Sequence, residues 1–469
     1  MLELLDQRTT LTGNQKRIIA AAILGDMLEF FDYFLIGYVL AFIVRPWELT
    51  YGQSAVMLLA SGVGAIPGAW FWGWMADRVG RRKIFIATVL TFSISTGLLA
   101  LTPDHGWIYM SIFRFLVGFG VGGLYVVDLP LVQEYVPTRM RGIVGGLVTA
   151  CIPIGTGLGA VFGAYLAPVV GWRGLFAAGL LPAALTLLVR AWVPESPRWL
   201  VRVGRIEEAR RSLAWALHMD PKDIVLPAQF PEPKKARLVE LFQHPRSVLV
   251  TWIGILGEQC GGYGVTLWAT TLLALLLKIS PSEAAYLMIW TSVGEFIGRL
   301  VFAYLSDRIG RVPCCIADGF GASVGLVVAA VYHDSFIGTA SVFWLAIMFA
   351  RFFSGGGFAA IGPYAAEVWP AHLRATGMGS AYGFGSIGKI IGPLGLALIV
   401  GTSNVVRPQA TVDAILPAFL FLAGCHFISG LAFCFGKETR GRSIEQIDTD
   451  FVPAAPMAAA SVGRPREAD

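Results

Sequence analysis

The chain has 469 residues, of which 55% are hydrophobic and 14% are charged, and its formal net charge is +5. A soluble domain carries about a quarter charged residues, so this composition excludes an ordinary soluble protein and requires a lipid-like solvent. The positive charge lies mainly in predicted loops and indicates no nucleic-acid partner.

The predicted elements are apolar runs that are each long enough to cross a bilayer as a helix. The first run is too long for the apolar region of a cleavable signal peptide, so it is interpreted as the first span. The sequence therefore predicts an all-α membrane protein with twelve transmembrane helices. In chain order the runs cover residues 18–43, 54–76, 84–101, 107–128, 142–168, 173–192, 247–277, 284–304, 314–332, 338–360, 375–401 and 413–435.

A polar stretch separates the first six runs from the last six. We expect residues 1–193 to form an N-terminal six-helix bundle and residues 247–436 to form a C-terminal one. Residues 194–246 are predicted to be a linker with short amphipathic helices, such as one over Arg205–Arg211. Residues 437–469 are predicted to be a partly disordered tail, rich in Ala and Pro at its end.

The distribution of positive charge predicts the orientation in the membrane. With the N-terminus inside, most of the 36 Lys and Arg residues fall in inner loops or tails. The predicted outer loops hold only Arg45, Arg173, Lys278 and Arg407. Positive charge favours the cytoplasmic side, so both termini are predicted to be cytoplasmic, in a bacterial-type inner membrane.

Three charged motifs occur twice, at matching places in the two sets of six runs. The repeats predict two homologous, pseudo-symmetric bundles, a design that holds substrate near the midplane between the halves. The pairs are Asp77-Arg78-Val-Gly80-Arg81 with Asp307-Arg308-Ile-Gly310-Arg311, Arg114-Phe-Leu-Val-Gly118 with Arg351-Phe-Phe-Ser-Gly355, and Glu134 and Arg141 with Glu367 and Arg374.

These motifs resemble those of the major facilitator superfamily over nearly the whole chain. The stretch Gly73–Lys83 is similar to its signature loop between helices 2 and 3. Pro194–Trp199 resembles the motif that follows helix 6 in the sugar-porter-like branch, and Lys437–Ser443 resembles that branch's C-terminal motif. The branch includes sugar porters, organic anion and cation carriers, niacin carriers and bacterial aromatic-acid/proton symporters.

The chain departs from sugar porters where those bind sugar. Their paired glutamines in helix 7 correspond here to Glu258 and Gln259, and their helix 5 glutamine has no counterpart. A sugar needs many neutral donors and acceptors, so these departures argue against a sugar substrate. The stretch Gly25–Tyr33 is closer to metabolite/proton symporters.

Ionisable residues inside spans are costly in a bilayer and are functional candidates. Helix 1 carries Asp26, Glu29 and Asp32 along one stripe, and helix 4 carries Arg114. At about 1.5 Å per residue, Asp32 and Arg114 lie at a similar depth. We expect Asp32 and Arg114 to form a proton-coupling pair, with Glu29 and Asp26 as further candidates. The family resemblance implies the same roles.

The substrate-binding candidates lie in or near the predicted cavity. Lys389 of helix 11 would attract an anion unless it pairs with Glu258 or Glu295, and both possibilities remain open at this stage. Glu258 would bind substrate or a proton, or would make a structural contact. Glu295 and Arg299 are four residues apart and are interpreted as a local pair. The remaining candidates are Gln259, Tyr263, Trp268, Tyr33, Tyr364 and Tyr382.

Charged residues at the inner ends of helices are predicted to latch the two halves together in the outward-open state. These gating candidates are Asp77, Arg78, Arg81, Glu134, Arg141, Asp307, Arg308, Glu367 and Arg374.

No metal-ligand or disulfide spacing and no phosphate-binding loop occurs in the sequence, so we expect no cofactor and a proton gradient as the energy source. The sequence indicates a secondary active transporter, not an enzyme. The leading hypothesis is proton-coupled symport of a small organic acid, an aromatic or other monocarboxylate, by a monomer in the lipid bilayer. A carrier of an organic cation, zwitterion or sugar-like solute and a non-transporting membrane sensor are the alternatives.

Overall fold

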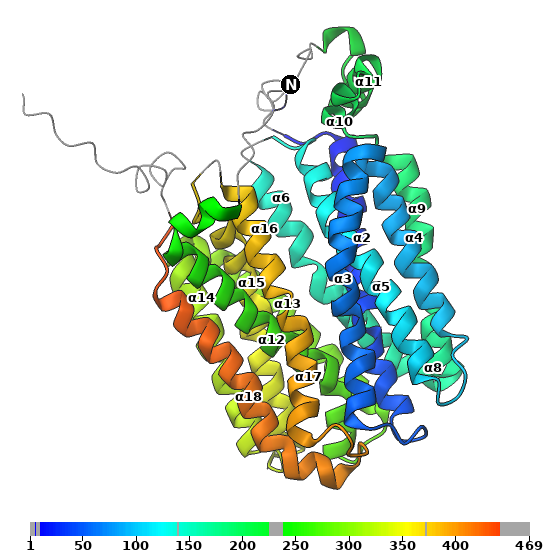
Figure 1. Cartoon of the computed structure of the whole chain (residues 1–469), viewed down its shortest axis with the longest axis vertical. Coiled ribbons are helices and arrows are strands. Elements are labelled where there is room, and N and C mark those ends of the chain that lie inside the picture. Colours follow the sequence, from blue (N-terminus) through cyan, green and yellow to red (C-terminus); the bar gives the residue numbers. More distant parts are fainter. Residues whose placement is uncertain (1–4, 6–9, 138–139, 225–237, 371–372, 441–469) are drawn as a thin grey trace, which may run out of the picture.

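The computed structural model describes residues 5, 10–137, 140–224, 238–370 and 373–440. The predicted tail beyond residue 440 and the linker segment 225–237 lie outside the described residues. Two bundles of long helices lie side by side, one built from the N-terminal and one from the C-terminal half of the chain (Figure 1). "Inner end" below means the end of the bundles that the charge distribution predicts to face the cytoplasm, and "outer end" means the opposite one.

The first bundle holds six spans, four of which are single helices. The fifth span is broken into α6, α7, the π-helical segment η2 and the start of α8, and the sixth consists of the rest of α8 and α9. The elements are α2 (Gly13–Ile43), α3 (Tyr51–Val79), α4 (Arg81–Leu99), α5 (Trp107–Gln133), α6 (Arg141–Ala150), α7 (Ile152–Val161), η2 (Phe162–Leu166), α8 (Ala167–Ala178) and α9 (Leu181–Trp192).

The second bundle repeats this arrangement, with a broken helix as its fifth member. Its elements are α12 (Pro245–Leu276), α13 (Pro281–Arg308), α14 (Arg311–Val331), α15 (Val342–Glu367), α16 (Arg374–Gly385), α17 (Gly388–Val400) and α18 (Pro408–Cys434). The predicted span 338–360 starts too early, because residues 336–341 form a two-stranded hairpin of β1 (Phe336–Ile337) and β2 (Ala340–Ser341). Gly338 has φ 61° at that turn, where glycine is favoured.

The linker contains short helices, as the sequence predicts. They are α10 (Pro197–Arg202), α11 (Ile206–Leu217) and the 3₁₀ turns η3 (Pro221–Asp223) and η4 (Leu238–Gln243). Helix α11 lies beyond the inner end of the first bundle (Figure 1).

Nine helical segments of the described chain are both long and apolar enough to cross a bilayer. Helix α2 fails this test for an informative reason, because Asp26, Glu29 and Asp32 are three acids in one span. With α2, α12 and the α8–α9 span the fold has twelve transmembrane helices.

The broken spans occupy corresponding places in the two bundles. The fifth span breaks at Cys151, between α6 and α7, and the eleventh breaks at Ser386 and Ile387, between α16 and α17. Broken helices at matching positions of two repeats mark the binding region in transporters of this design. Lys389 is the second residue of α17 and lies two residues after the second break.

The two bundles are joined at the outer end by main-chain hydrogen bonds. The amides of Tyr51 and Gly52, the first residues of α3, donate to the carbonyl oxygens of Asn404 and Thr402, each at 2.9 Å. The amide of Val406 donates to Leu49 O, also at 2.9 Å, and Thr50 and Val405 form an antiparallel bridge. The first amides of a helix lack partners within that helix, and here the other bundle supplies them. We call this contact the outer seal.

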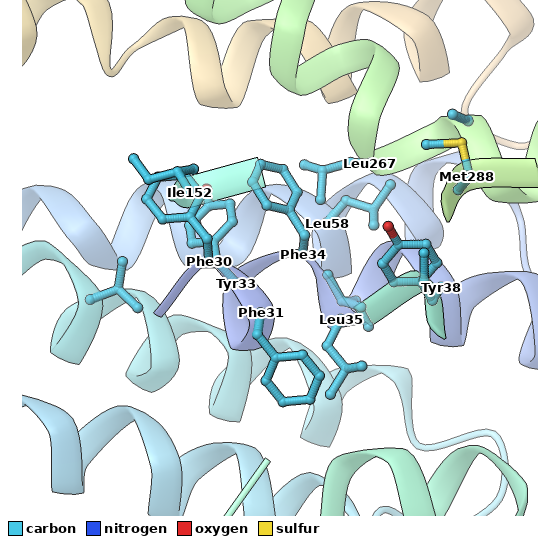
Figure 2. Close-up of a cluster of buried hydrophobic side chains, with 14 of the residues drawn as sticks. Phe30, Phe31, Tyr33, Phe34, Leu35, Tyr38, Leu58, Ile152, Leu267 and Met288 are labelled. Carbon is cyan, nitrogen blue, oxygen red and sulfur yellow. The ribbon is translucent and has the colours of Figure 1, made fainter. Parts of the chain in front are cut away.

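Helix α2 lies at the centre of the molecule and packs against both bundles. Figure 2 shows its Phe30, Phe31 and Phe34 among buried apolar side chains, with Leu267 of α12 nearby. Gly37 allows the close contact, because a Cβ atom there would lie 3.0 Å from Leu267 O. This packing holds Glu29 and Tyr33 of α2 at the interface of the halves.

Candidate functional site

The fully buried guanidinium of Arg114 lies against helix α2. Its Nη1 donates to Asp32 O at 3.0 Å and its Nη2 donates to Tyr33 O at 2.6 Å. Among the described residues Arg114 forms no ion pair with a carboxylate. The structure therefore brings Asp32 and Arg114 together, but the expected carboxylate–guanidinium contact is replaced by bonds to the main chain.

Four side chains form a row that crosses from the first bundle to the second, and we call it the central row. The Arg114 guanidinium lies 5.7 Å from the centre of the Tyr33 ring. The Tyr33 ring meets the Tyr263 ring edge to face at 5.5 Å, and the Lys389 ammonium lies 5.0 Å from the Tyr263 ring. The faces of aromatic rings attract cations. A positive charge therefore lies at each end of the tyrosine pair, Arg114 at Tyr33 and Lys389 at Tyr263.

Lys389 forms no ion pair with any described residue, and its side chain is partly buried. The alternative that Lys389 pairs with Glu258 or Glu295 does not hold in this structure. Glu258 contacts His426, and Glu295 accepts from Arg351 at 2.6 Å. Glu29 is the acid near enough for its charge to interact with the ammonium.

Several polar atoms beside the central row lack hydrogen-bond partners among the described residues. They are Tyr33 Oη, Gln259 Oε1 and Glu29 Oε2. Gln259 packs against Gly388, next to Lys389. Buried polar atoms are nearly always bonded, so unpaired ones at the interface of two halves are available to a ligand.

Three acids cluster one to two turns along α2 from the central row, towards the inner end. Asp26 and Glu29 of α2 and Asp128 of α5 are almost completely buried. The carboxyl groups of Asp26 and Asp128 are within hydrogen-bonding reach of each other. A hydrogen bond between two carboxyl groups requires that one of them carries a proton. The cationic side chains of Arg299 and Lys389 act on this cluster from the second bundle.

The Asp32 carboxyl group is fully buried within the first bundle. Its nearest polar neighbour is Thr96 of α4, and Gly179 makes room for both side chains. Both carboxyl oxygens lack a hydrogen bond from the described residues. Burying a lone charge is costly, so this environment suits a group that holds a proton.

The other predicted substrate contacts are more dispersed. Trp268 donates to Pro393 O at 3.2 Å and packs on Tyr51, so it belongs to the outer seal. Tyr364 packs on Phe433 near the inner end of the second bundle. Tyr382 lies on α16 near Gly362. Glu258 points into the second bundle and not towards the central row.

Arg299 forms the expected local pair with Glu295, but the contact is long and each residue has a further partner. Its Nη2 is 3.9 Å from Glu295 Oε1, whereas Glu295 Oε2 is 2.6 Å from Arg351. Arg299 also donates a hydrogen bond to Thr149 O, on α6 of the first bundle. The main partner of Glu295 is therefore Arg351, and Arg299 bridges the two halves.

The predicted gating residues of the first bundle form a cluster within that bundle. Arg81 pairs with Glu134 at 3.5 Å, and Ser196 donates to the same carboxylate. The Arg82 amide at the start of α4 donates to Glu195 Oε1 at 3.0 Å. Burial raises the pKa of Glu134, and the charge of Arg81 opposes this shift. Gly80, with φ 112°, provides the tight turn before α4.

The second bundle repeats this cluster residue for residue. Arg311 lies 3.6 Å from Glu367, Thr439 donates to Glu367 at 2.6 Å, and the Val312 amide donates to Glu438 Oε2 at 3.0 Å. Gly310 has φ 118° before α14. Glu195, in the motif after the sixth span, therefore caps the start of α4. Glu438, in the motif after the twelfth span, caps the start of α14 in the same way.

The remaining gating candidates also contact their own side of the molecule. Asp77 lies 3.3 Å from Arg202 of α10, and Asp307 lies 2.5 Å from Arg311. Arg78 and Arg308 lie over Trp74 and Tyr304. Arg141 and Arg374 donate to Val136 O and Trp369 O. These contacts hold loops to helices within one half, so a latch between halves stays a prediction for another state.

Sequence reasoning missed two ionisable residues inside spans, Asp318 of α14 and His426 of α18, which meet Glu258 in the second bundle. The rule that singled out the other buried acids would have found them. Among the described residues no group of three His, Cys, Asp or Glu side chains could hold a metal ion.

Comparisons with known proteins place the whole chain. A family model described as "Sugar (and other) transporter" matches residues 18–451. The niacin transporter NiaP of Acinetobacter baylyi is 27% identical, over 90% of this chain and 94% of that protein. The cis,cis-muconate transport protein of the same organism is 26% identical, over 87% and 91%. A probable 4-methylmuconolactone transporter of Cupriavidus pinatubonensis is 28% identical, over 95% and 96%.

Solved structures of the same architecture cover nearly the same length. The partially occluded inward-open form of the xylose transporter XylE from E. coli aligns with a TM-score of 0.71 at 20% identity, over 92% of this chain and all of that one. The proton:xylose symporter XylE bound to 6-bromo-6-deoxy-D-glucose aligns with a TM-score of 0.68 at 19% identity, over 94% and 100%. At this identity the likeness concerns the fold.

Proposed function

The chain belongs to the sugar (and other) transporter family of the major facilitator superfamily, and from that premise we propose that it is a proton-coupled symporter of a small organic acid, an aromatic or other monocarboxylate. It is a multi-pass membrane transporter of a small-molecule substrate. In our proposal it lies in the cell inner membrane as a monomer with both termini cytoplasmic.

The observation that carries the proposal is the central row. Arg114 and Lys389 are cations without a carboxylate partner among the described residues, and two tyrosine rings lie between them. A carboxylate gains a charge-assisted hydrogen bond from such a cation, and the tyrosines offer faces for a flat substrate. Because Tyr33 and Tyr263 belong to different halves, a substrate there contacts both halves.

The names of several relatives support this substrate class. Niacin, cis,cis-muconate and 4-methylmuconolactone are the solutes named for the similar transporters. Niacin carries one carboxyl group and cis,cis-muconate carries two, so these names support an organic acid without choosing between one carboxylate and two.

Proton coupling is proposed for the acids of α2. Arg114 bonds the main-chain oxygen of Asp32, but the Asp32 carboxyl group receives no hydrogen bond from Arg114 or from any other described donor. Substrate at Arg114 or movement of α2 changes the charge near Asp32, and its affinity for a proton changes in response. Asp26 and Glu29 are the further candidates.

The acid cluster favours a second candidate function, transport of an organic cation. Asp26, Glu29 and Asp128 would then hold the substrate charge. An organic cation/carnitine transporter 7 of Arabidopsis thaliana is 27% identical to this chain. Lys389, a cation beside Tyr263 without an ion-pair partner among the described residues, makes the acid substrate the better fit.

A counterflow assay in liposomes tests the proposal. Liposomes that contain the purified protein are loaded with unlabelled organic acid. Uptake of the labelled acid is then followed with and without an inward proton gradient. We expect counterflow without a gradient and accumulation with one. Uptake of amines but not acids would overturn the acid assignment in favour of the cation carrier, and the absence of counterflow for all solutes would favour a sensor.

A further inference from the structure

Three ionisable side chains meet inside the second bundle, away from the central row. They are Glu258 of α12, Asp318 of α14 and His426 of α18, with exposed fractions of 0%, 0% and 1%. His426 Nδ1 lies 2.9 Å from Glu258 Oε2. The carboxyl group of Asp318 is within hydrogen-bonding reach of that of Glu258.

Two glycines make room for this cluster. A Cβ atom at Gly261 would overlap the His426 ring, and one at Gly357 of α15 would overlap the Asp318 carboxyl group. Any larger residue at either position would displace an ionisable group. The packing therefore fixes these side chains next to one another in a space that accommodates little else.

The polar atoms of the cluster are incompletely satisfied by the described residues. Asp318 Oδ1, Asp318 Oδ2 and Glu258 Oε1 are buried and receive no hydrogen bond from a protein donor. Two ionised carboxylates in contact inside a bundle repel each other, and burying them without donors is costly. A proton placed between them removes a charge and supplies the missing hydrogen bond.

The surroundings offer little other compensation. The cation on the neighbouring α15, Arg351, already donates to Glu295 at 2.6 Å and to Ser354 at 3.2 Å. The charged or titratable groups facing the cluster from its own and adjacent elements are Arg351 of α15, Glu295 of α13, and Cys314 and Cys315 of α14.

We propose that Glu258, Asp318 and His426 form a second proton-binding site, in the C-terminal half and separate from the acids of α2. A hydronium ion gives its proton to a carboxylate oxygen of the Glu258–Asp318 pair: one O–H bond of the hydronium breaks, one O–H bond forms on the carboxyl group, a water molecule is left, and the reverse step releases the proton. Helix α12 carries both Glu258 and, little more than one turn later, Tyr263 of the central row. Protonation of the cluster is thereby linked to the position of the substrate site.

Infrared difference spectroscopy of the full-length purified protein tests the proton itself, without substrate. As pH is raised, the wild type is expected to lose the carbonyl band of a protonated carboxyl group that Asp318→Asn and Glu258→Gln both lack. Glu283→Gln, which removes an exposed carboxylate at the outer end, is the control and should leave that band unchanged. His426→Gln keeps a possible donor to Glu258 and should shift the pH at which the band disappears.

A transport measurement tests the consequence, and this arm alone rests on the proposed function. In liposomes, the voltage that balances a fixed substrate gradient gives the number of protons moved per substrate. Asp318→Asn should move one proton fewer than the wild type. An unchanged band in both acid variants would overturn the proton site even if organic-acid symport is intact. Loss of the band with an unchanged proton number would overturn its part in coupling. If Asp318→Asn does not fold, the His426→Gln variant still tests the proposal. A band that disappears at the same pH in His426→Gln as in the wild type would count against it.

Discussion

The guanidinium of Arg114 donates a hydrogen bond to the main-chain oxygen of Asp32, 3.0 Å away, and not to that residue's carboxylate. The contact therefore survives any change of the Asp32 side chain. A substitution at Asp32 therefore removes the titratable carboxyl group but keeps the hydrogen bond that holds Arg114. Its effect on coupling can be measured without also releasing Arg114, which would not be possible for an ion pair.

Asp32→Asn should abolish accumulation driven by a proton gradient and keep exchange of substrate at least in part. Asparagine imitates the protonated acid permanently, and exchange needs no net proton movement. Both assays are run on one preparation in liposomes. Retained gradient-driven accumulation would show that the coupling proton lies elsewhere, with Glu29, Asp26 and Glu258 the next candidates.

Lys389→Ala should weaken binding of an organic acid by about 1.5–3 kcal/mol, the size of a hydrogen bond to a charged group, or roughly tenfold to more than a hundredfold in Kd. Lys389→Arg keeps the charge near Tyr263 and should lose much less. Titration calorimetry with the purified variants measures this. If both variants bind the acid as tightly as the wild type, Lys389 does not hold the substrate.

Asp77→Asn should reduce transport and leave the unfolding temperature almost unchanged, since its pairing with Arg202 is exposed and such pairs contribute little to stability. We expect substrate binding to persist, with the protein biased towards inward-open states. Asp104→Asn removes a comparable exposed pair, with Arg173, near the outer end of the molecule and is the matched control. Transport at the wild-type rate in Asp77→Asn would contradict the gating role.

The pH dependence of stability should change in Glu134→Gln. Burial raises the pKa of Glu134 above its ordinary value of 4.5. Between the ordinary and the raised value the folded state holds more protons than the unfolded state, so stability falls as pH rises through that range. In the glutamine variant this fall should be smaller. Unfolding temperatures in detergent across acidic pH measure the effect, and identical slopes would disprove it.

Gly52→Ala should loosen the outer seal. A Cβ atom there would lie 2.8 Å from Thr402 O, which is closer than real contacts allow. A cysteine introduced at the buried position Thr411, in a cysteine-depleted background, should then react faster with a reagent that does not cross the membrane. Gly379→Ala, where a Cβ meets nothing within 4 Å, is the control. Equal labelling rates in both would argue against the seal.

The spans of this protein could be predicted from the sequence because apolar runs of sufficient length have few alternatives in a bilayer. The predicted start of the tenth span at residue 338 is four residues too early, since residues 338–341 belong to the turn and second strand of a hairpin that hydropathy does not distinguish from a helix. The breaks before Lys389 and at Cys151 were also not foreseen, because glycine and proline are common in membrane helices.

The site was predictable in its members more than in its contacts. The estimated depths of Asp32 and Arg114 along their helices predicted correctly that the two residues lie close together. Depth does not give the direction of a side chain, so the hydrogen bond from Arg114 to the main chain of Asp32 could not be predicted. The row from Arg114 to Lys389 depends on the rotation of α2 against α12, which one sequence does not reveal. The local spacing predicted the pair of Glu295 with Arg299, which is present at 3.9 Å, but not the shorter contact of Glu295 with Arg351, 56 residues away, because that contact depends on how α13 packs on α15.

The outer seal has no ion pair among its bonds, and its one titratable group, the Tyr51 phenol, has its pKa raised to about 12 by burial. It consists of peptide hydrogen bonds and the hydroxyl contact of Tyr51 with Thr411 at 2.6 Å. Ionic strength and proton concentration act on charged pairs and leave such bonds almost untouched. The outer seal is therefore expected to hold equally well in dilute, saline or acidic media, while the charged clusters at the inner end should respond to the salt concentration and pH around them.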